Sequence, residues 1–420
     1  MGLISPGGYD GAHSVRNPPH FAFALALALA CTGAATSAWA EGAPAEQLPA
    51  LATGNQLTGD WWGMRSNLLQ NGIDIEAQLS VAGTMLSEPG LDAQRRYLQS
   101  RFTASVRLDT GPILGLPGGT LFGEFASISG ADGSPQEGVL QPYSTLDAPH
   151  RDQLNQLWYR QALWSGLVLI TAGKIDVNSE FDNCPVAAGF QNRGLAFSPT
   201  IIGLPTYPDP STGAEGEIDL GWLYLKGGEY DGDTLIGEPT GTRWLDASPT
   251  TRFEIVEAGL VWGATASGHL AELAVGGWQH TATLTRFDGS QAPGTRGAYG
   301  LADVQPWSSA GGGGIALFAE GGIADPRLTR YARHLGGGVV SSEPGGPHAN
   351  AIGLAATWVG TSREAGSPCD ADESVFELFL RYQAAGWLTL TPDVQLIRRP
   401  GGISTARDLY LGMLRADITF

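Results

Sequence analysis

The sequence predicts an all-β protein, a transmembrane antiparallel β-barrel of the outer membrane that begins with one short N-terminal helix. Three observations support this prediction. Segments of about ten residues alternate apolar and polar side chains, as strands with one lipid-facing and one lumen-facing side do. Their connections alternate between short turns and long inserts rich in Gly, Pro, Asp and Ser. The last alternating segment ends on Phe420.

The composition agrees with a barrel and excludes some other classes of protein. Hydrophobic residues make up 42% of the 420 residues, and no run of ~18 apolar residues follows the N-terminus, which argues against membrane helices but not against membrane strands. The 60 glycines suit many turns, and the 12 tryptophans suit aromatic belts. A net charge of −18 disfavours nucleic-acid binding.

The N-terminus has the pattern of an export signal. Residues 21–30 form a short apolar core with a basic residue before it and small residues at the cleavage positions after it. We therefore expect residues 1–40 to be a signal peptide and residues 41–57 to be a flexible linker. Export permits a disulfide between Cys184 and Cys369, but two free thiols fit the sequence equally well.

The next segment, 58–72, predicts a helix. Asp60 can cap its N-terminus, and Trp61, Met64 and Leu68 recur at helical spacing. An Asn-Gly pair then supplies a left-handed end.

From residue 73 the hydrophobic period becomes two, and the barrel domain is predicted to span 73–420. The clearest alternating segments are 100–109, 375–383, 387–397 and 408–420. Weaker strand candidates are 119–129, 153–164, 167–176, 217–226, 252–264, 269–281, 297–305, 313–321 and 350–359. The predicted irregular inserts are 130–150, 177–215, 228–250, 284–296 and 325–349. Together with the strand that begins at residue 73, these segments add up to about fourteen strands, and a couple more are expected because the signal of each strand is weak.

The C-terminal segment is the most diagnostic one. "DLYLGMLRADITF" alternates to the last residue, and Tyr410 and Phe420 would lie at opposite aromatic girdles. Ten residues tilted by ~40° span about 25 Å, the height of the apolar band of a barrel. The terminal Phe420 also resembles the signal that is recognised by the barrel assembly machinery.

Three blocks resemble the carbohydrate-selective porin (OprB-type) family. "LTGDWWGMRSNLLQNGI" is similar to the family's opening motif, with Trp62 where a glycine is common. "LWYRQALWSGLVLITAGKIDVNSEFDN" is similar to its central strand pair and the following loop. "VFELFLRYQAAGWLTLTPDVQLIRRPGG" and "LRADITF" are similar to its last strands.

The resemblance implies a barrel of ~16 strands in the outer membrane of a Gram-negative bacterium, through which sugars diffuse passively. It implies that the N-terminal helix lies at the periplasmic end of the lumen, with Trp61, Met64 and Leu68 against the inner wall. The partners would be small sugars, outer-membrane lipid and the assembly machinery. The chain could be a homotrimer or a monomer, and no cofactor is implied.

Candidate pore-lining residues follow from the side-chain alternation and from the resemblance. In 153–164 the apolar residues Leu157, Tyr159 and Leu163 would face lipid, so the alternate residues Gln156, Trp158, Arg160 and Trp164 would face the lumen. The resemblance implies that the loop after the next strand narrows the lumen. Paired charges and aromatic rings suit sugar hydroxyls and ring faces. The candidates are Arg101, Arg107, Glu124, Trp158, Arg160, Lys174, Asp176, Glu180 and Asp182.

Some alternatives stay open at this point. The family's glucose-passing members carry an Arg–Glu cluster soon after the third strand, whereas residues 127–138 here contain Glu137 and no arginine, so the sequence indicates sugars or polyols as a class. A general or organic-acid porin of the same fold, a barrel with a closed lumen, or a secreted carbohydrate-binding or hydrolytic β protein would share many features. No enzyme motif or metal-ligand spacing is present, which favours a channel.

Overall fold

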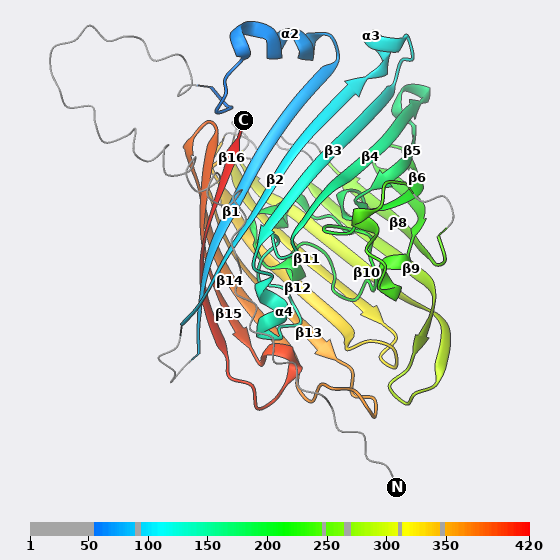
Figure 1. The fold of residues 1–420 in the computed structure, drawn as a ribbon, viewed down its shortest axis with the longest axis vertical. Coiled ribbons are helices and arrows are strands. Elements are labelled where there is room, and N and C mark those ends of the chain that lie inside the picture. Colours follow the sequence, from blue (N-terminus) through cyan, green and yellow to red (C-terminus); the bar gives the residue numbers. More distant parts are fainter. Residues whose placement is uncertain (1–53, 89–93, 246–248, 264–269, 310–312, 345–348) are drawn as a thin grey trace, which may run out of the picture. The chain divides into compact units, whose positions relative to one another are not determined.

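The chain forms a closed barrel of sixteen antiparallel strands in the computed structural model, and β1 pairs with β16 (Figure 1). The structure describes residues 54–420 except 89–93, 246–248, 264–269, 310–312 and 345–348. The predicted signal peptide and most of the predicted linker lie outside the described residues. The strands are β1 Ile73–Ser87, β2 Gln94–Asp109, β3 Gly119–Gly130, β4 Arg151–Leu163, β5 Val168–Ile175, β6 Ser211–Asp219, β7 Leu223–Asp231, β8 Arg252–Trp262, β9 Ala271–Thr285, β10 Gln291–Ser308, β11 Gly314–Ala324, β12 Tyr331–Ser342, β13 Ala351–Thr361, β14 Glu373–Ala385, β15 Leu388–Arg398 and β16 Leu409–Thr419.

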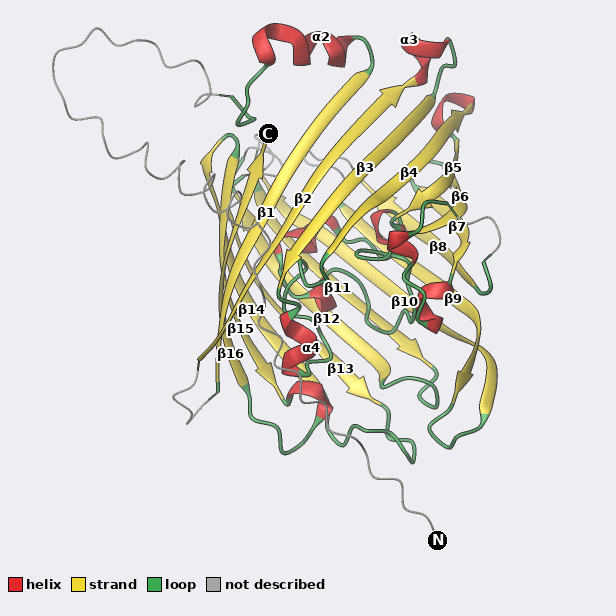
Figure 2. Ribbon diagram, viewed as in Figure 1, coloured by secondary structure: helices red, strands yellow, loops and turns green. Residues whose placement is uncertain are grey.

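The helices are short and lie either before the first strand or in the connections between strands (Figure 2). The α-helices are α2 Met64–Gln70, α3 Thr110–Leu114 and α4 Gly133–Glu137. The 3-10 turns are η1 Trp61–Gly63, η2 Trp164–Gly166, η3 Val177–Ser179, η4 Pro185–Gly189, η5 Arg193–Leu195, η6 Asp233–Ile236, η7 Thr240–Thr242 and η9 Pro400–Gly402. Within the described ranges no helix is long and apolar enough to cross a membrane.

In neighbouring strands, successive side chains alternate between the outer and the inner face of the barrel. Val256 of β8 and Val275 of β9 are each 61% exposed, whereas Glu257 and Ala274, which follow and precede them in the chain, are 4% and 1% exposed. The apolar residues point out of the barrel, and their chain neighbours point into it. This arrangement suits a barrel whose outer surface contacts lipid.

An aromatic girdle marks the end of the barrel where the turns are short. Trp164, Trp222, Trp262 and Trp307 lie at or next to the connections β4–β5, β6–β7, β8–β9 and β10–β11, and all four are largely exposed. Tryptophan combines an apolar ring with a polar N–H, which suits the boundary between membrane and water. We therefore take this rim as one membrane interface. We assign it to the periplasmic side because outer-membrane barrels have short periplasmic turns and longer extracellular loops.

The barrel closes through a C-terminal strand that is well anchored. The Phe420 N–H donates to the carbonyl of Ala77 at 2.9 Å, and the Phe420 and Phe102 rings meet edge-on with their centroids 6.4 Å apart. Arg65 of α2 donates to the carbonyl oxygen of Phe420 at 2.9 Å. The last residue therefore joins β16, β1 and the N-terminal helix.

The helix is present at the periplasmic end, but its predicted burial in the lumen is wrong. None of its residues is buried, Met64 is 55% exposed and Trp62 is fully exposed. The physical reason is backbone conformation, because Trp61, Trp62 and Gly63 all have positive φ angles of 49°, 59° and 88°. Three successive left-handed residues break the helical stripe in which Trp61, Met64 and Leu68 would have shared one face.

Two strand predictions are also wrong in detail. The predicted strand 217–226 spans a turn, because β6 ends at Asp219 and β7 begins at Leu223. Gly221, with φ of 82°, and the Asp219 carboxylate, which accepts from the Gly221 N–H at 2.6 Å, make this turn. The predicted insert 325–349 contains β12, whose consecutive glycines hide the alternation.

Candidate functional site

The long connection between β5 and β6, residues 176–210, lies against the inner wall of the barrel. Its Val177, Phe181 and Ile201 belong to one buried cluster with Phe253 of β8 and Trp278 of β9. Burial of these side chains stabilises the loop inside the barrel by roughly 1.5–3 kcal/mol each. We call residues 176–210 the lumen loop.

Farther along, the lumen loop packs against another part of the inner wall, at β14. The Phe190 ring meets the Phe379 ring of β14 edge-on, with 4.8 Å between centroids. A Cβ on Gly189 would lie 2.3 Å from the Phe379 ring, so only glycine allows this close approach. The Glu377 carboxylate on β14 accepts from the backbone N–H groups of Gln191 and Asn192, the latter at 3.0 Å.

The connection between β3 and β4, residues 131–150, also packs inside the barrel. Tyr143 and Leu146 are buried in a cluster with residues of β1 and of β14 to β16. The Glu373 carboxylate accepts from the backbone N–H groups of Leu140 and Gln141, both at 2.8 Å. Glu373 and Glu377, two carboxylates on the inner face of β14, therefore hold two different inward-folded loops.

Replacing Glu377 by Ala is expected to loosen the lumen loop and leave the barrel intact. The change leaves the N–H groups of Gln191 and Asn192 without acceptors, at roughly 1–3 kcal/mol each. Single-channel recordings of the variant should show larger and noisier conductance than the wild type. The exposed outer-face residue Glu229 offers a control, because Glu229→Ala should leave the conductance unchanged. Equal, quiet conductance in Glu377→Ala and wild type would show that this anchor does not hold the loop.

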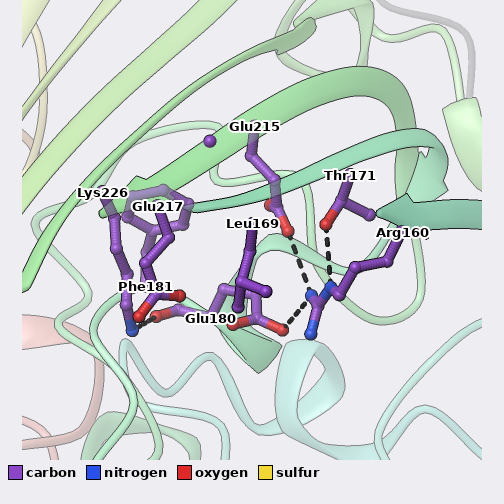
Figure 3. A pocket seen from close by; sticks show the side chains of 9 residues that line it. Arg160, Leu169, Thr171, Glu180, Phe181, Glu215, Glu217 and Lys226 are labelled. Carbon is purple, nitrogen blue, oxygen red and sulfur yellow. Dashed lines mark hydrogen bonds and ion pairs between the residues drawn. The ribbon is translucent and has the colours of Figure 1, made fainter. Parts of the chain in front are cut away.

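A charged cluster lies where the lumen loop meets the β4–β6 wall (Figure 3). The Arg160 guanidinium donates to Glu180 of the loop at 2.6 Å, to Thr171 of β5 at 2.9 Å and to Glu215 of β6 at 3.4 Å. These contacts fix the guanidinium in a fork between a wall carboxylate and a loop carboxylate. The side chains of Arg160 and Glu180 remain 27% and 23% exposed, so the pair is accessible to a solute.

A second cation completes this cluster. Lys226 of β7 donates to the backbone carbonyl of Glu180 at 3.1 Å and lies over the Tyr224 ring. Lys226 and Glu217 line the same small pocket as Arg160, Glu180 and Glu215. We call these five residues the constriction cluster. It holds three carboxylates and two cations, so its charges nearly balance.

Aromatic rings lie next to the constriction cluster. Trp158 of β4 stacks on Phe122 of β3 with centroids 4.9 Å apart and an interplanar angle of 25°. Arg160 lies over the Trp158 ring at 5.2 Å, and Arg107 lies over the Phe122 ring at 5.4 Å. The two cations therefore flank a stacked aromatic pair, which offers an apolar face next to hydrogen-bonding groups.

Other candidate residues from the sequence lie in structural roles. Lys174 of β5 pairs in the sheet with Leu157 of β4, and not with Trp158. Its ammonium donates to three backbone carbonyls at 2.6 Å each, those of Leu154, Gly241 and Arg243. The structure thus places Lys174 away from the constriction cluster. Trp164, expected in the lumen, lies exposed at the periplasmic rim because β4 ends at Leu163.

Asp176 and Asp182 stabilise the lumen loop from within. The Asp176 carboxylate accepts from the Thr206 hydroxyl at 2.6 Å and from the Tyr207 N–H, and burial raises its pKa. The Asp182 carboxylate accepts from the Ser198 N–H at 2.6 Å. Both carboxylates brace the loop, while Glu180 between them reaches the wall.

Arg101 and Glu124 line the wall beside the loop. Arg101 lies over the ring of Tyr207, a lumen-loop residue, at 5.1 Å. Glu124 accepts from the Asn155 side chain at 2.6 Å. Neither residue borders the pocket of the constriction cluster.

Sequence reasoning missed Glu215, Glu217 and Lys226 as well as the partner of Glu137. Treating 217–226 as one strand concealed the β6–β7 turn, although the Asp-Leu-Gly sequence at that turn could have revealed it. Glu137 forms an ion pair with Arg95 of β2 at 2.6 Å, so its arginine comes from before the third strand.

Cys184 and Cys369 are both free and buried. Across the described residues, no His, Cys, Asp and Glu group could hold a metal ion.

The loop 131–150 contains a carboxyl group that should respond to pH. Burial raises the pKa of Asp147 from 3.8 to about 6, against the opposing hydrogen bond from Ser134. Because the folded state favours the protonated form, docking of this loop should weaken as the pH rises from about 4 to about 6, by up to roughly 3 kcal/mol. Hydrogen-exchange protection of residues 131–150 should therefore be higher at pH 5 than at pH 7. Asp147→Asn should remove that difference, and a pH dependence that survives in the variant would contradict this assignment.

Residues 95–420 match the model of the family described as "Carbohydrate-selective porin, OprB family". Porin B of Pseudomonas aeruginosa is 22% identical over 422 residues, covering 87% of this chain and 91% of porin B. The high-pH structure of Pseudomonas putida OprB aligns with a TM-score of 0.78 at 18% identity, over 88% of this chain and 99% of that chain. The low-pH structure of the same protein aligns with a TM-score of 0.56 at 14% identity, with the same coverage.

The solved structures share the fold of this chain, and the family model spans well over half of its length. The chain therefore belongs to the carbohydrate-selective porin, OprB family, and its barrel lies in the outer membrane of a Gram-negative bacterium.

Proposed function

We propose that this porin takes up mono- or oligosaccharides or polyols by passive diffusion, and that the constriction cluster and the Phe122–Trp158 pair contact the passing sugar. The observation that carries the proposal is the Arg160–Glu180 ion pair, which joins the lumen loop to the wall beside two stacked rings. Charged donors and acceptors can replace water around sugar hydroxyls, and the rings can contact the apolar face of a sugar.

A porin for organic acids is the second candidate within the same fold. Three carboxylates against two cations in the constriction cluster disfavour an anion there. The near balance of charge suits an uncharged solute better. The family and the fold are those of a channel rather than of an enzyme, and we infer that the chain carries no catalytic activity. We also propose that the barrel assembly machinery recognises Phe420.

Replacing Trp158 by Ala is expected to weaken the block of ion current by a disaccharide without shifting the reversal potential. Stacking contributes roughly 0.5–1.5 kcal/mol in addition to area burial and carries no net charge, so the inhibition constant should rise about tenfold. Trp262, at the periplasmic rim, provides the control, because Trp262→Ala should leave the block unchanged. An unchanged block in Trp158→Ala would remove the aromatic pair from the sugar path.

A further inference from the structure

An arginine lies on the lipid-facing side of the barrel near the end opposite the tryptophan girdle. In β12, Arg333 alternates with buried Ala332 and His334, and it shares its face with Leu335, which is 61% exposed. Its register neighbours are Ile323 on β11 and Gly360 on β13. Arg333 is the third residue of β12, so it lies only ~7 Å along the strand from the extracellular rim.

Within the described ranges of the chain, the Arg333 charge has no counter-ion. Among the residues that the structure describes, Arg333 makes no hydrogen bond or ion pair. Arg252, another exposed arginine near the same rim, has Glu229 at 3.4 Å. A lipid-facing charge costs free energy unless it reaches the interface or a partner, and phosphate is the partner that a guanidinium binds through two parallel hydrogen bonds.

A hollow in the outer wall adjoins Arg333. Two adjoining pockets share Ile323, Arg333 and Trp358. One continues down the wall past the small residues Ala298 and Gly321, and the other reaches the rim at Arg363 and Asp372. Arg363 and Asp372 pair with each other at 2.7 Å, so Asp372 does not neutralise Arg333; Glu364 also borders the rim pocket.

The ring of Trp358 forms one wall of this hollow. A Cβ on Gly360 would lie 2.5 Å from the Trp358 indole, so the ring lies over the bare backbone of Gly360 toward the rim. Tryptophan prefers the level where lipid headgroups begin. The hollow therefore combines a cation and an interfacial ring at headgroup depth with an apolar channel directed toward the acyl chains.

We propose that this hollow binds one phosphorylated lipid of the outer leaflet. A phosphate group binds Arg333, and an acyl chain lies along Ala298, Gly321 and Ile323 with the Trp358 ring beside it. Charge complementarity supports this occupant, because the chain as a whole carries −18 and still exposes an uncompensated guanidinium to the membrane here. A second copy of the chain is the competing occupant, and the experiment separates the two.

The test uses the full folded barrel in detergent and titrates it with lipid A, a phosphorylated glycolipid, under native mass spectrometry. The wild type should retain one lipid A, and Arg333→Gln should weaken this retention at least about tenfold. Lipid A stripped of its phosphates should bind the wild type as weakly. Arg333→Lys should give an intermediate result, because it keeps the charge and loses the bidentate geometry.

Arg96 provides the matched control. It is exposed on β2 in register with Met85, which is 45% exposed, and it borders none of the pockets around Arg333. Arg96→Gln should leave lipid retention unchanged, and heat-modifiable migration should show that every variant is folded. Three results would overturn the proposal: equal weakening in Arg96→Gln, undiminished binding of dephosphorylated lipid, or a change in cross-linked oligomers in Arg333→Gln while lipid retention persists.

Discussion

Deletion of Phe420 is expected to lower the amount of folded barrel in the outer membrane several-fold, while the channels that do insert conduct normally. The deletion removes the Phe102–Phe420 ring contact and the hydrogen bond from the Phe420 N–H to Ala77. It leaves the β1–β16 pairing from Gln78 to Ser87 in place, so the finished barrel can still close. Losses of 1–2 kcal/mol during assembly change abundance several-fold. Quantitative immunoblots of purified outer membranes, together with planar-bilayer conductance, measure the two quantities separately.

Two variants separate recognition of the aromatic ring from the contact made by the backbone. Phe420→Tyr keeps an aromatic terminus and should assemble at nearly the normal level. Arg65→Gln removes the helix contact to the Phe420 carbonyl and keeps the ring, so its membrane level should also be nearly normal. Normal membrane levels in the Phe420 deletion would refute the assembly role.

Replacing Arg160 by Gln is expected to make the channel strongly cation-selective and to weaken its block by sugars. The change leaves Glu180, Glu215 and Glu217 facing Lys226 alone. A charge 4–8 Å from a passing ion contributes roughly 2–4 kcal/mol at an effective dielectric constant near 20. The reversal potential in a salt gradient should therefore shift toward the cation limit. The disaccharide inhibition constant should rise because the guanidinium donors are lost.

The matched control is Arg252→Gln on the outer face, which removes the same charge from the chain without touching the lumen. Its reversal potential should equal that of the wild type. A double variant with Glu180→Gln should restore part of the original selectivity, since it removes one carboxylate as well. If Arg160→Gln alone changes neither reversal potential nor sugar block, the path of the solute lies elsewhere in the barrel.

Alternation allowed much of the fold to be predicted, because each strand carries its own two-residue period. The clearest strands, such as β14 and β16, keep large apolar or aromatic side chains at most outward positions. β12 was missed because its outward and inward residues around Gly336–Gly338 carry no side chains to alternate. The helix was misplaced because helical spacing does not reveal the left-handed backbone at Trp61 and Trp62.

The site could be predicted only where one strand determines it. Trp158 and Arg160 share a face on β4, and that follows from parity. Their partners come from other parts of the chain, as Glu215 does from β6. The role of Lys174 could not be predicted, because its ammonium donates to three backbone carbonyls. The pattern of side chains along a strand carries no information about backbone acceptors.

The anchors of the two inward loops also set an order for folding. Gln191 and Glu377 are 186 positions apart, and Gln141 and Glu373 are 232 apart, so neither loop can reach its final acceptors until β14 has joined the sheet. Contacts of such long sequence separation form late, since closing a long chain segment costs entropy before the contact is made. The narrow passage is therefore one of the last features to mature. A barrel that enters the membrane before its loops dock has a wide opening, and it becomes selective only when they do.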